Sequence, residues 1–265
     1  MTVKVLHFDK TTKEVFVDTN PGAGGWAAIN AKDKDGKIIW SWNVWVNNDA
    51  VGVFDVLSEK KMQDRALGAV SPHSSPSGTI AQSHGMFYQW GRKDPFTPNR
   101  NAHRVLSLWV YDINAKKLNP TSNNGLGEVF KHSNVAATNI SAMIQSPTTF
   151  FTNVITEIDW WSTTTKTIYD PCPEGYMVAP NVYDGDRWTG NYNHGRNWRD
   201  RAFSLNGRRD AASGRFNQLD HGFYWSSNRV NNTQASSLQF VHDGNINITQ
   251  SEPINSGFGV RCVTQ

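Results

Sequence analysis

The sequence predicts a mainly β protein of the α+β class, with long loops and few short helices. Helical signals are scarce, and short apolar runs alternate with turn residues, which is typical of strands joined by turns. The chain is also rich in Gly and large aromatics, with 21 Gly and 11 Trp among 265 residues. Charged residues make up only 18% and aromatics 12%, a composition that favours a folded chain over a disordered one.

The first predicted element is a hairpin near the N-terminus. Residues 3–8 and 14–18 have the composition of two short strands around a polar turn. The segment Pro21-Gly22-Ala23-Gly24-Gly25 follows and breaks regular structure. It predicts a seam between an N-terminal β extension or linker (residues 1–24) and a single domain (residues 25–265).

A second hairpin is predicted from residues 26–30 and 37–46. The Asp35-Gly36 pair between them is a strong signal for a tight turn. Both faces of the second strand carry bulky side chains, so we expect at least one face to be covered.

The middle of the chain predicts loops, one strand and one helix. Residues 71–83 and 119–124 are polar loops, and residues 104–112 are an apolar strand candidate. Residues 139–150 are expected to begin as a short helix that ends at Ser146-Pro147, because a residue before proline is disfavoured in a helix.

The chain contains two cysteines, Cys172 and Cys262. A pair about ninety residues apart suits one long-range disulfide better than a redox motif or a zinc site, which need closer or more numerous ligands. Two buried free thiols in a reducing compartment remain the alternative. We favour the disulfide, and with it an extracytoplasmic protein.

Several sequence blocks together resemble a known family. The blocks nearest the cysteines are Cys172-Pro173-Glu174-Gly175-Tyr176, Gly222-Phe223-Tyr224-Trp225-Ser226-Ser227 and Gly257-Phe258-Gly259-Val260-Arg261-Cys262. Earlier blocks fit in the same order at residues 35–45, 64–69, 85–96 and 146–150. From about residue 25 to its end, the chain resembles the Fibrobacter succinogenes major paralogous domain, a C-type-lectin-like module of Bacteroidetes surface and fimbrial-tip proteins.

This resemblance implies a C-type-lectin-like fold with Phe223, Tyr224, Trp225 and Phe258 on or near the core. It also places both cysteines at the family's structural positions. The same fold includes a formylglycine-generating branch that uses a reactive cysteine pair, and here no cysteine would be left for such chemistry. The targets of diversity-generating retroelements have a related fold, and the many Asn residues near the C-terminus are compatible with them.

Motifs for catalysis are missing from the sequence. Hydrolytic nucleophile motifs, phosphate-binding Gly loops and His-Glu-x-x-His are absent, and the eight His are scattered. The densest carboxylate set could form a glycosidase pair or simply build turns; it comprises Asp184, Asp186, Asp200, Asp210 and Asp220. We expect no enzyme activity and no cofactor.

Metal, nucleic acid and membrane partners are also not expected. Glu252-Pro253-Ile254 is only a fragment of the calcium-lectin pattern, with no Trp-Asn-Asp after it. The net charge is +3 without a Lys/Arg run, and no apolar stretch approaches the roughly 18 residues of a membrane helix. Met1-Thr2-Val3-Lys4 lacks the apolar region of a signal peptide, so export would need a leader or upstream domain not present in this chain.

A ligand-binding surface is predicted from segments rich in aromatics, Arg and Asn, which are typical of recognition surfaces. C-type-lectin-like folds bring such segments together on one face, as the resemblance implies here. The predicted ligand-binding residues are Trp188, Tyr192, Arg196, Trp198, Asn228, Arg229, Asn231, Asn232, Asn245 and Asn247. The alternatives are that Trp188 and Trp198 plug the core and that the asparagines only shape turns.

The sequence therefore predicts a noncatalytic ligand-binding or adhesion module at the bacterial cell surface, such as a fimbrial tip or a retroelement-diversified binding protein. Its partner would be a host or bacterial surface protein or glycan. One alternative is a carbohydrate-active enzyme or its accessory domain. The other is a purely structural fimbrial or surface subunit.

Overall fold

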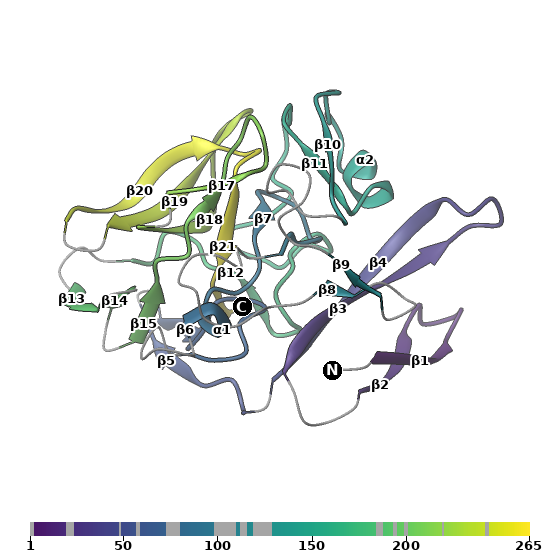
Figure 1. Ribbon diagram of the computed structural model, residues 1–265, viewed down its shortest axis with the longest axis horizontal. Coiled ribbons are helices and arrows are strands. Elements are labelled where there is room, and N and C mark those ends of the chain that lie inside the picture. Colours follow the sequence, from purple (N-terminus) through teal and green to yellow (C-terminus); the bar gives the residue numbers. More distant parts are fainter. Residues whose placement is uncertain are drawn as a thin grey trace.

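The chain folds into a mainly β structure with two short helices among the residues described (Figure 1). The computed structural model describes residues 3–19, 24–47, 49–56, 59–72, 80–97, 110–111, 116–118, 129–183, 188–192, 195–198, 201–218, 220–241 and 244–265. Within these residues, no helix is both long and apolar enough to cross a membrane.

Two antiparallel hairpins form the N-terminal part and confirm the predicted ones. The first joins β1 (Val3–Phe8) to β2 (Val15–Thr19), and the second joins β3 (Gly25–Lys32) to β4 (Ile38–Val46). The Asp33 carboxylate shapes the second turn by accepting from the backbone N–H groups of Asp35 and Lys37. Both hairpins lie on the opposite side of the molecule from the long strands β18–β20 (Figure 1).

One face of β4 is covered by the body of the molecule through a buried polar cluster. The Lys93 ammonium donates to Asp94 at 2.9 Å and to the Ser41 carbonyl at 2.9 Å, and it lies over the Trp40 ring. Asn43 donates from the same face to the Lys93 carbonyl. The expected covering of one face is therefore confirmed.

A curled seven-stranded sheet forms the main framework, in the order β17-β16-β21-β18-β19-β20, with β7 paired to β21. Its strands are β7 (Tyr88–Gln89), β16 (Arg208–Arg209), β17 (Phe216–Asn217), β18 (His221–Asn231), β19 (Gln234–Val241), β20 (Ile246–Pro253) and β21 (Gly257–Val260). Leu238 and Phe240 point inward as predicted, and Ile246 and Ile248 pack half-buried beside them. The predicted Asp243 turn residue lies outside the described residues.

A four-stranded sheet in the order β12-β22-β6-β5 contains the disulfide region. It consists of β5 (Val53–Asp55), β6 (Lys61–Gln63), β12 (Tyr176–Val178) and β22 (Cys262–Thr264). The Cys172–Cys262 disulfide is present, as the sequence predicted. The buried Asp170 carboxylate shapes this region by accepting from the N–H groups of Cys172 and Val178.

The remaining elements are short. They are α1 (Ile80–Ser83), β8 (Val110–Tyr111), β9 (Lys117–Leu118), β10 (Lys131–Ser133), α2 (Ile140–Gln145), β11 (Thr149–Phe151), β13 (Trp188–Tyr192), β14 (Gly195–Trp198) and β15 (Arg201–Ser204). The predicted helix is confirmed as α2, because Asn139 caps its first turn and the helix stops at Ser146 before Pro147. Of the strand candidate 104–112, only β8 is described. The polar loop 119–124 and residues 73–79 of the loop predicted at 71–83 lie outside the described residues. Residues 80–83 of that predicted loop form α1 instead.

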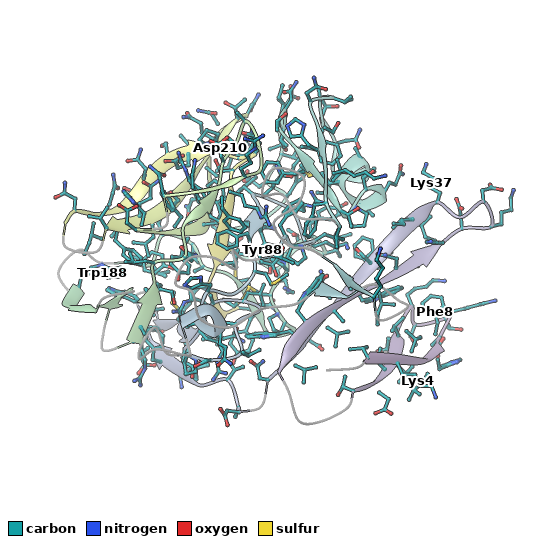
Figure 2. The ribbon with its side chains drawn as sticks, in the orientation of Figure 1. Lys4, Phe8, Lys37, Tyr88, Trp188 and Asp210 are labelled. Atoms are coloured by element: carbon teal, nitrogen blue, oxygen red, sulfur yellow. A yellow bond between two sulfur atoms is a disulfide. The ribbon has the colours of Figure 1, made fainter. Side chains whose placement is uncertain are left out.

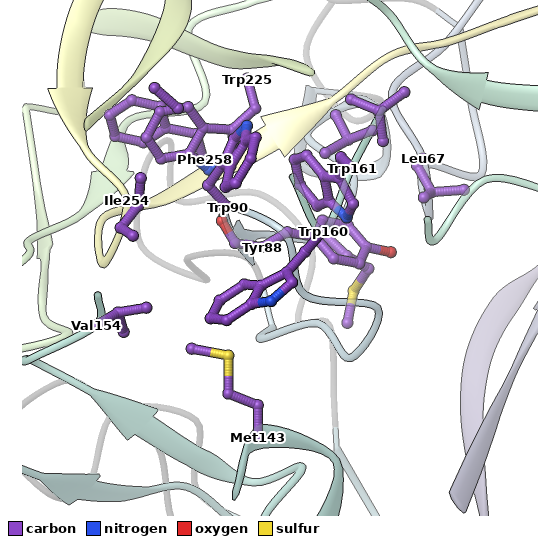
Figure 3. Packing of buried hydrophobic residues seen from close by; sticks show 14 of the residues in the cluster. Leu67, Tyr88, Trp90, Met143, Val154, Trp160, Trp161, Trp225, Ile254 and Phe258 are labelled. Carbon is purple, nitrogen blue, oxygen red and sulfur yellow. Dashed lines mark hydrogen bonds between the residues drawn. The ribbon is translucent and has the colours of Figure 1, made fainter. Parts of the chain in front are cut away.

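The aromatic core confirms the predicted burial of four residues, Phe223, Tyr224, Trp225 and Phe258. Trp225 stacks on Phe258 with ring centroids 4.2 Å apart, and its indole N–H donates to the Tyr88 carbonyl at 2.8 Å. Figure 3 shows this pair beside Trp90 and Trp161. Tyr224 points to a second cluster on the other face of β18, so this strand is buried on both faces.

Removing the disulfide should destabilise the protein. The double substitution of Cys172 and Cys262 by Ser is expected to lower the free energy of unfolding by about 2–5 kcal/mol, because the bond restricts the unfolded chain. Urea denaturation measures this loss, and unreduced wild-type protein should show no thiol that reacts under denaturing conditions. Equal urea midpoints for both proteins would contradict the structural role.

Trp225→Ala should cost about 3–5 kcal/mol of stability, because it empties a large buried site. Trp225→Phe is the matched variant. It keeps a ring to stack on Phe258 and loses the hydrogen bond to Tyr88, so its loss should be smaller. Thermal unfolding compares the two, and a melting temperature unaffected by the Ala substitution would refute the core position.

Candidate functional site

The sequence analysis predicted that Trp198 contacts the ligand, and the structure places it in the core instead. The predicted loop instead forms the antiparallel strands β13, β14 and β15, with Trp188 opposite Trp198. The Trp198 side chain is 0% exposed and packs against Tyr183 and Phe203. A fully buried ring cannot face a ligand, so Trp198 supports the core, as the alternative interpretation proposed.

Trp188 is half-buried at one end of the molecule, opposite the N-terminal hairpin that carries Phe8 (Figure 2). Its ring lies 5.3 Å from that of Phe240 and 5.4 Å from that of Phe203. The backbones of Tyr192 and Arg196 belong to β13 and β14, and their side chains lie outside what the structure describes.

The predicted binding segments do not converge on one compact site. Gln234 at the start of β19 pairs with Pro253, and Phe240 near its end pairs with Ile246. At about 3.3 Å per residue, these two ends of the strand are about 20 Å apart. Asn231 and Asn232 precede one end, whereas Asn245 and Asn247 lie at the other, on the side of Trp188. The predicted residues therefore lie at two separate ends of the strand pair.

Asn245 and Asn247 have local structural roles at their end of the sheet. The Asn245 carbonyl accepts from the Val241 N–H across the β19–β20 turn. The Asn247 side chain accepts from the Thr249 N–H at 3.1 Å and donates to Gln250 at 2.7 Å. These contacts fit the interpretation of the asparagines as turn and edge residues.

At the other end, the turn between β18 and β19 is built by asparagine side chains. Asn231 accepts from the N–H and hydroxyl of Thr233, and it donates to Gln234 at 2.8 Å. Asn228 accepts from the backbone N–H of Asn181 and from the Ser226 hydroxyl. Both side chains hold the backbone of the turn in place.

Arg229 joins this turn to a second segment that the sequence prediction missed. Its guanidinium donates to Asp159 at 2.6 Å and to the Asn232 side chain at 3.1 Å. The Thr156 N–H donates to the Asn232 carbonyl at 3.0 Å. The two segments, residues 155–159 and 228–233, form what we call the hairpin-tip surface.

The hairpin-tip surface exposes three large aliphatic side chains. Ile158 is 64% exposed, Val230 51% and Ile155 38%. Single exposed aliphatics are ordinary, whereas several in adjoining segments with polar neighbours are typical of an interaction site. No local motif marks residues 155–159, because their place beside Asn232 arises only from tertiary pairing.

A second polar cluster lies on the sheet and was also missed. Arg208 pairs with Glu252 at 3.3 Å, and Gln239 donates to the same carboxylate at 2.6 Å. Arg208 and His221 both stack on the buried Phe223 ring. Because these groups bind one another across the sheet, we interpret the cluster as an interaction that stabilises the sheet.

Two of the five aspartates considered as a possible glycosidase pair are described, and their hydrogen bonds are to residues close to them in the sequence. Asp210 accepts from the Ala212 N–H and the Ser213 hydroxyl. Asp220 is exposed, and its hydrogen bond with His221 lowers the pKa of its carboxyl. Asp184, Asp186 and Asp200 lie outside the described residues. Among the residues described, no three His, Cys, Asp or Glu side chains are grouped to hold a metal ion.

Comparisons with protein-family models, curated proteins and solved structures find no match to this chain. The site is therefore chosen on geometry. The hairpin-tip surface combines exposed aliphatics, an ion pair and amides on a firmly held turn, and it is the candidate functional site.

Trp198 and Arg229 should differ in their effects on stability. Trp198→Ala is expected to cost about 3–5 kcal/mol, because it removes a fully buried ring. Arg229→Ala should cost less than about 1 kcal/mol, because its partner Asp159 is largely exposed and solvent screens the pair. Urea denaturation separates them. A Trp198→Ala protein as stable as wild type would contradict the buried position of Trp198.

Proposed function

We propose that the chain is a noncatalytic ligand-binding or adhesion module of C-type-lectin-like fold, displayed on a bacterial surface. The observation that carries this proposal is the hairpin-tip surface, where Ile158 and Val230 lie exposed on segments joined by the Arg229–Asp159 pair. Exposed apolar side chains with polar neighbours provide contact area and hydrogen bonds to a partner.

The scaffold under this surface supports a binding role. The turn continues from β18, which the buried Trp225 and Tyr224 anchor on both faces. The Thr156 hydroxyl accepts from the Ile158 N–H and donates to the Ile158 carbonyl, which holds the second segment. A surface that is ordered before binding loses little conformational freedom on association.

The resemblance to the lectin-like family also supports the proposal. Its first C-terminal block leads into β12, and the other two lie on β18 and on β21–β22. Together these blocks contain both cysteines of the disulfide and the Trp225–Phe258 stack. A disulfide is typical of proteins in oxidising surroundings such as the bacterial surface. This fits an exported protein.

A structural surface subunit is the second candidate, and one feature favours it. The two-stranded hairpin β1–β2 contacts β4 through Phe8 and Trp42, and it exposes Val5, Leu6 and Phe16. Two-stranded hairpins are marginally stable alone in water, so this one would gain from packing against a neighbouring subunit.

Binding to whole cells tests the proposal. Fluorescent protein should bind saturably to bacterial or cultured epithelial cells, and Val230→Asp should weaken binding about tenfold, as loss of one central contact allows. Val53→Asp is the matched control, because Val53 is 42% exposed on β5, outside the hairpin-tip surface. Absence of saturable binding, or equal losses in both variants, would reject the adhesion role.

A further inference from the structure

We infer that the partner of the hairpin-tip surface is a protein presenting an apolar patch beside a Lys or Arg side chain. This inference rests on the proposed function and narrows its ligand from protein or glycan to protein. It follows from three features of the surface: its aliphatic character, its local charge and its rigid polar rim.

The apolar contacts on this surface are branched aliphatic side chains. Residues 155–159 and 228–233 contain no aromatic residue. The neighbouring Trp160 and Trp161 are 2% and 0% exposed, so their rings are turned into the core. A sugar ring packs its C–H groups on a flat aromatic face, which this surface does not offer. Ile158, Val230 and Ile155 instead suit the apolar side chains of a protein interface.

The charge of the surface is opposite to that of the whole chain. The surface carries two carboxylates, Glu157 and Asp159, and one guanidinium, Arg229, so its formal charge is negative, whereas the net charge of the whole chain is +3. Glu157 is exposed and has no ion pair with any residue that the structure describes. Charge complementarity therefore favours a basic residue on the partner.

A polar rim completes the surface. Asn231, Asn232 and Thr233 are exposed around the turn. Asn231 accepts from the Thr233 N–H and Asn232 accepts from Arg229, which fixes where their remaining donors and acceptors point. An apolar centre with a hydrogen-bonding rim is the usual organisation of protein–protein interfaces.

Selective treatment of the target cells tests the inference. Cells that bind the fluorescent chain are treated with protease, which removes surface proteins, or with periodate, which oxidises glycans. Protease should abolish binding and periodate should leave it unchanged. Loss after periodate, with or without loss after protease, would assign the ligand to a glycan. Binding that withstands both treatments would assign it to lipid. Either result overturns the inference and leaves the adhesion role intact.

Reversing the charge of Glu157 is a second test of the inference. Glu157→Lys should weaken binding about tenfold, because it replaces attraction to a basic partner with repulsion. The matched control is Glu174→Lys, an exposed carboxylate outside the hairpin-tip surface, and it should bind like wild type. Unchanged or tighter binding by Glu157→Lys would contradict a basic partner. A dimer that Val230→Asp disperses in sedimentation would identify a second copy of the chain as the occupant and also overturn the inference.

Discussion

The structure depends on buried guanidinium groups that hold loops in place. Backbone carbonyls outside regular strands need hydrogen-bond donors when they are buried, and a planar guanidinium can serve several at once. Arg92 donates to the carbonyls of Ser146 and Pro147, before β11, and to that of Thr149, its first residue. Burial lowers the pKa of Arg92 to about 10, so it remains charged near neutral pH. Since β11 leads into residues 155–159, this clamp helps to position one half of the hairpin-tip surface. Arg65 and Arg209 bind the carbonyls of other loops in the same way. Arg261 donates to a carbonyl of β6 and to one of β15.

Local signals in the sequence predicted those parts of the fold that depend on neighbouring residues. Turn chemistry at Asp33 and Asp35-Gly36 predicted the second hairpin, and Asn139 with Pro147 bounded the helix. The resemblance supplied the core positions of Trp225 and Phe258. Prediction failed where distant segments decide the outcome. Gly and Asn between Trp188 and Trp198 favoured a loop, but pairing with β15 produced strands and turned Trp198 inward.

The sequence predicted only one of the two segments of the candidate site, because the other is brought there by contacts between distant segments. Arg229 and its neighbouring asparagines stood out by composition, whereas Ile158 and Asp159 did not. Their contribution arises because Thr156 binds the Asn232 carbonyl, a contact between segments far apart in the sequence. The sheet register also separates Asn231 from Asn247, although both asparagines are near the C-terminus. Composition pointed to Arg229 and its neighbouring asparagines, and strand register decided which of the predicted residues lie close together.

The disulfide determines how a pulling force would pass through the chain. Tension applied before Cys172 and after Cys262 passes through the sulfur–sulfur bond and bypasses the loop between them, residues 173–261. Residues 228–233 lie inside this unloaded loop, whereas residues 155–159 lie outside it, on the loaded path. The two halves of the hairpin-tip surface would therefore feel a pulling force differently. Their shared contacts, the Arg229–Asp159 pair and the Thr156–Asn232 hydrogen bond, therefore join a part of the chain that would carry the force to a part that would not.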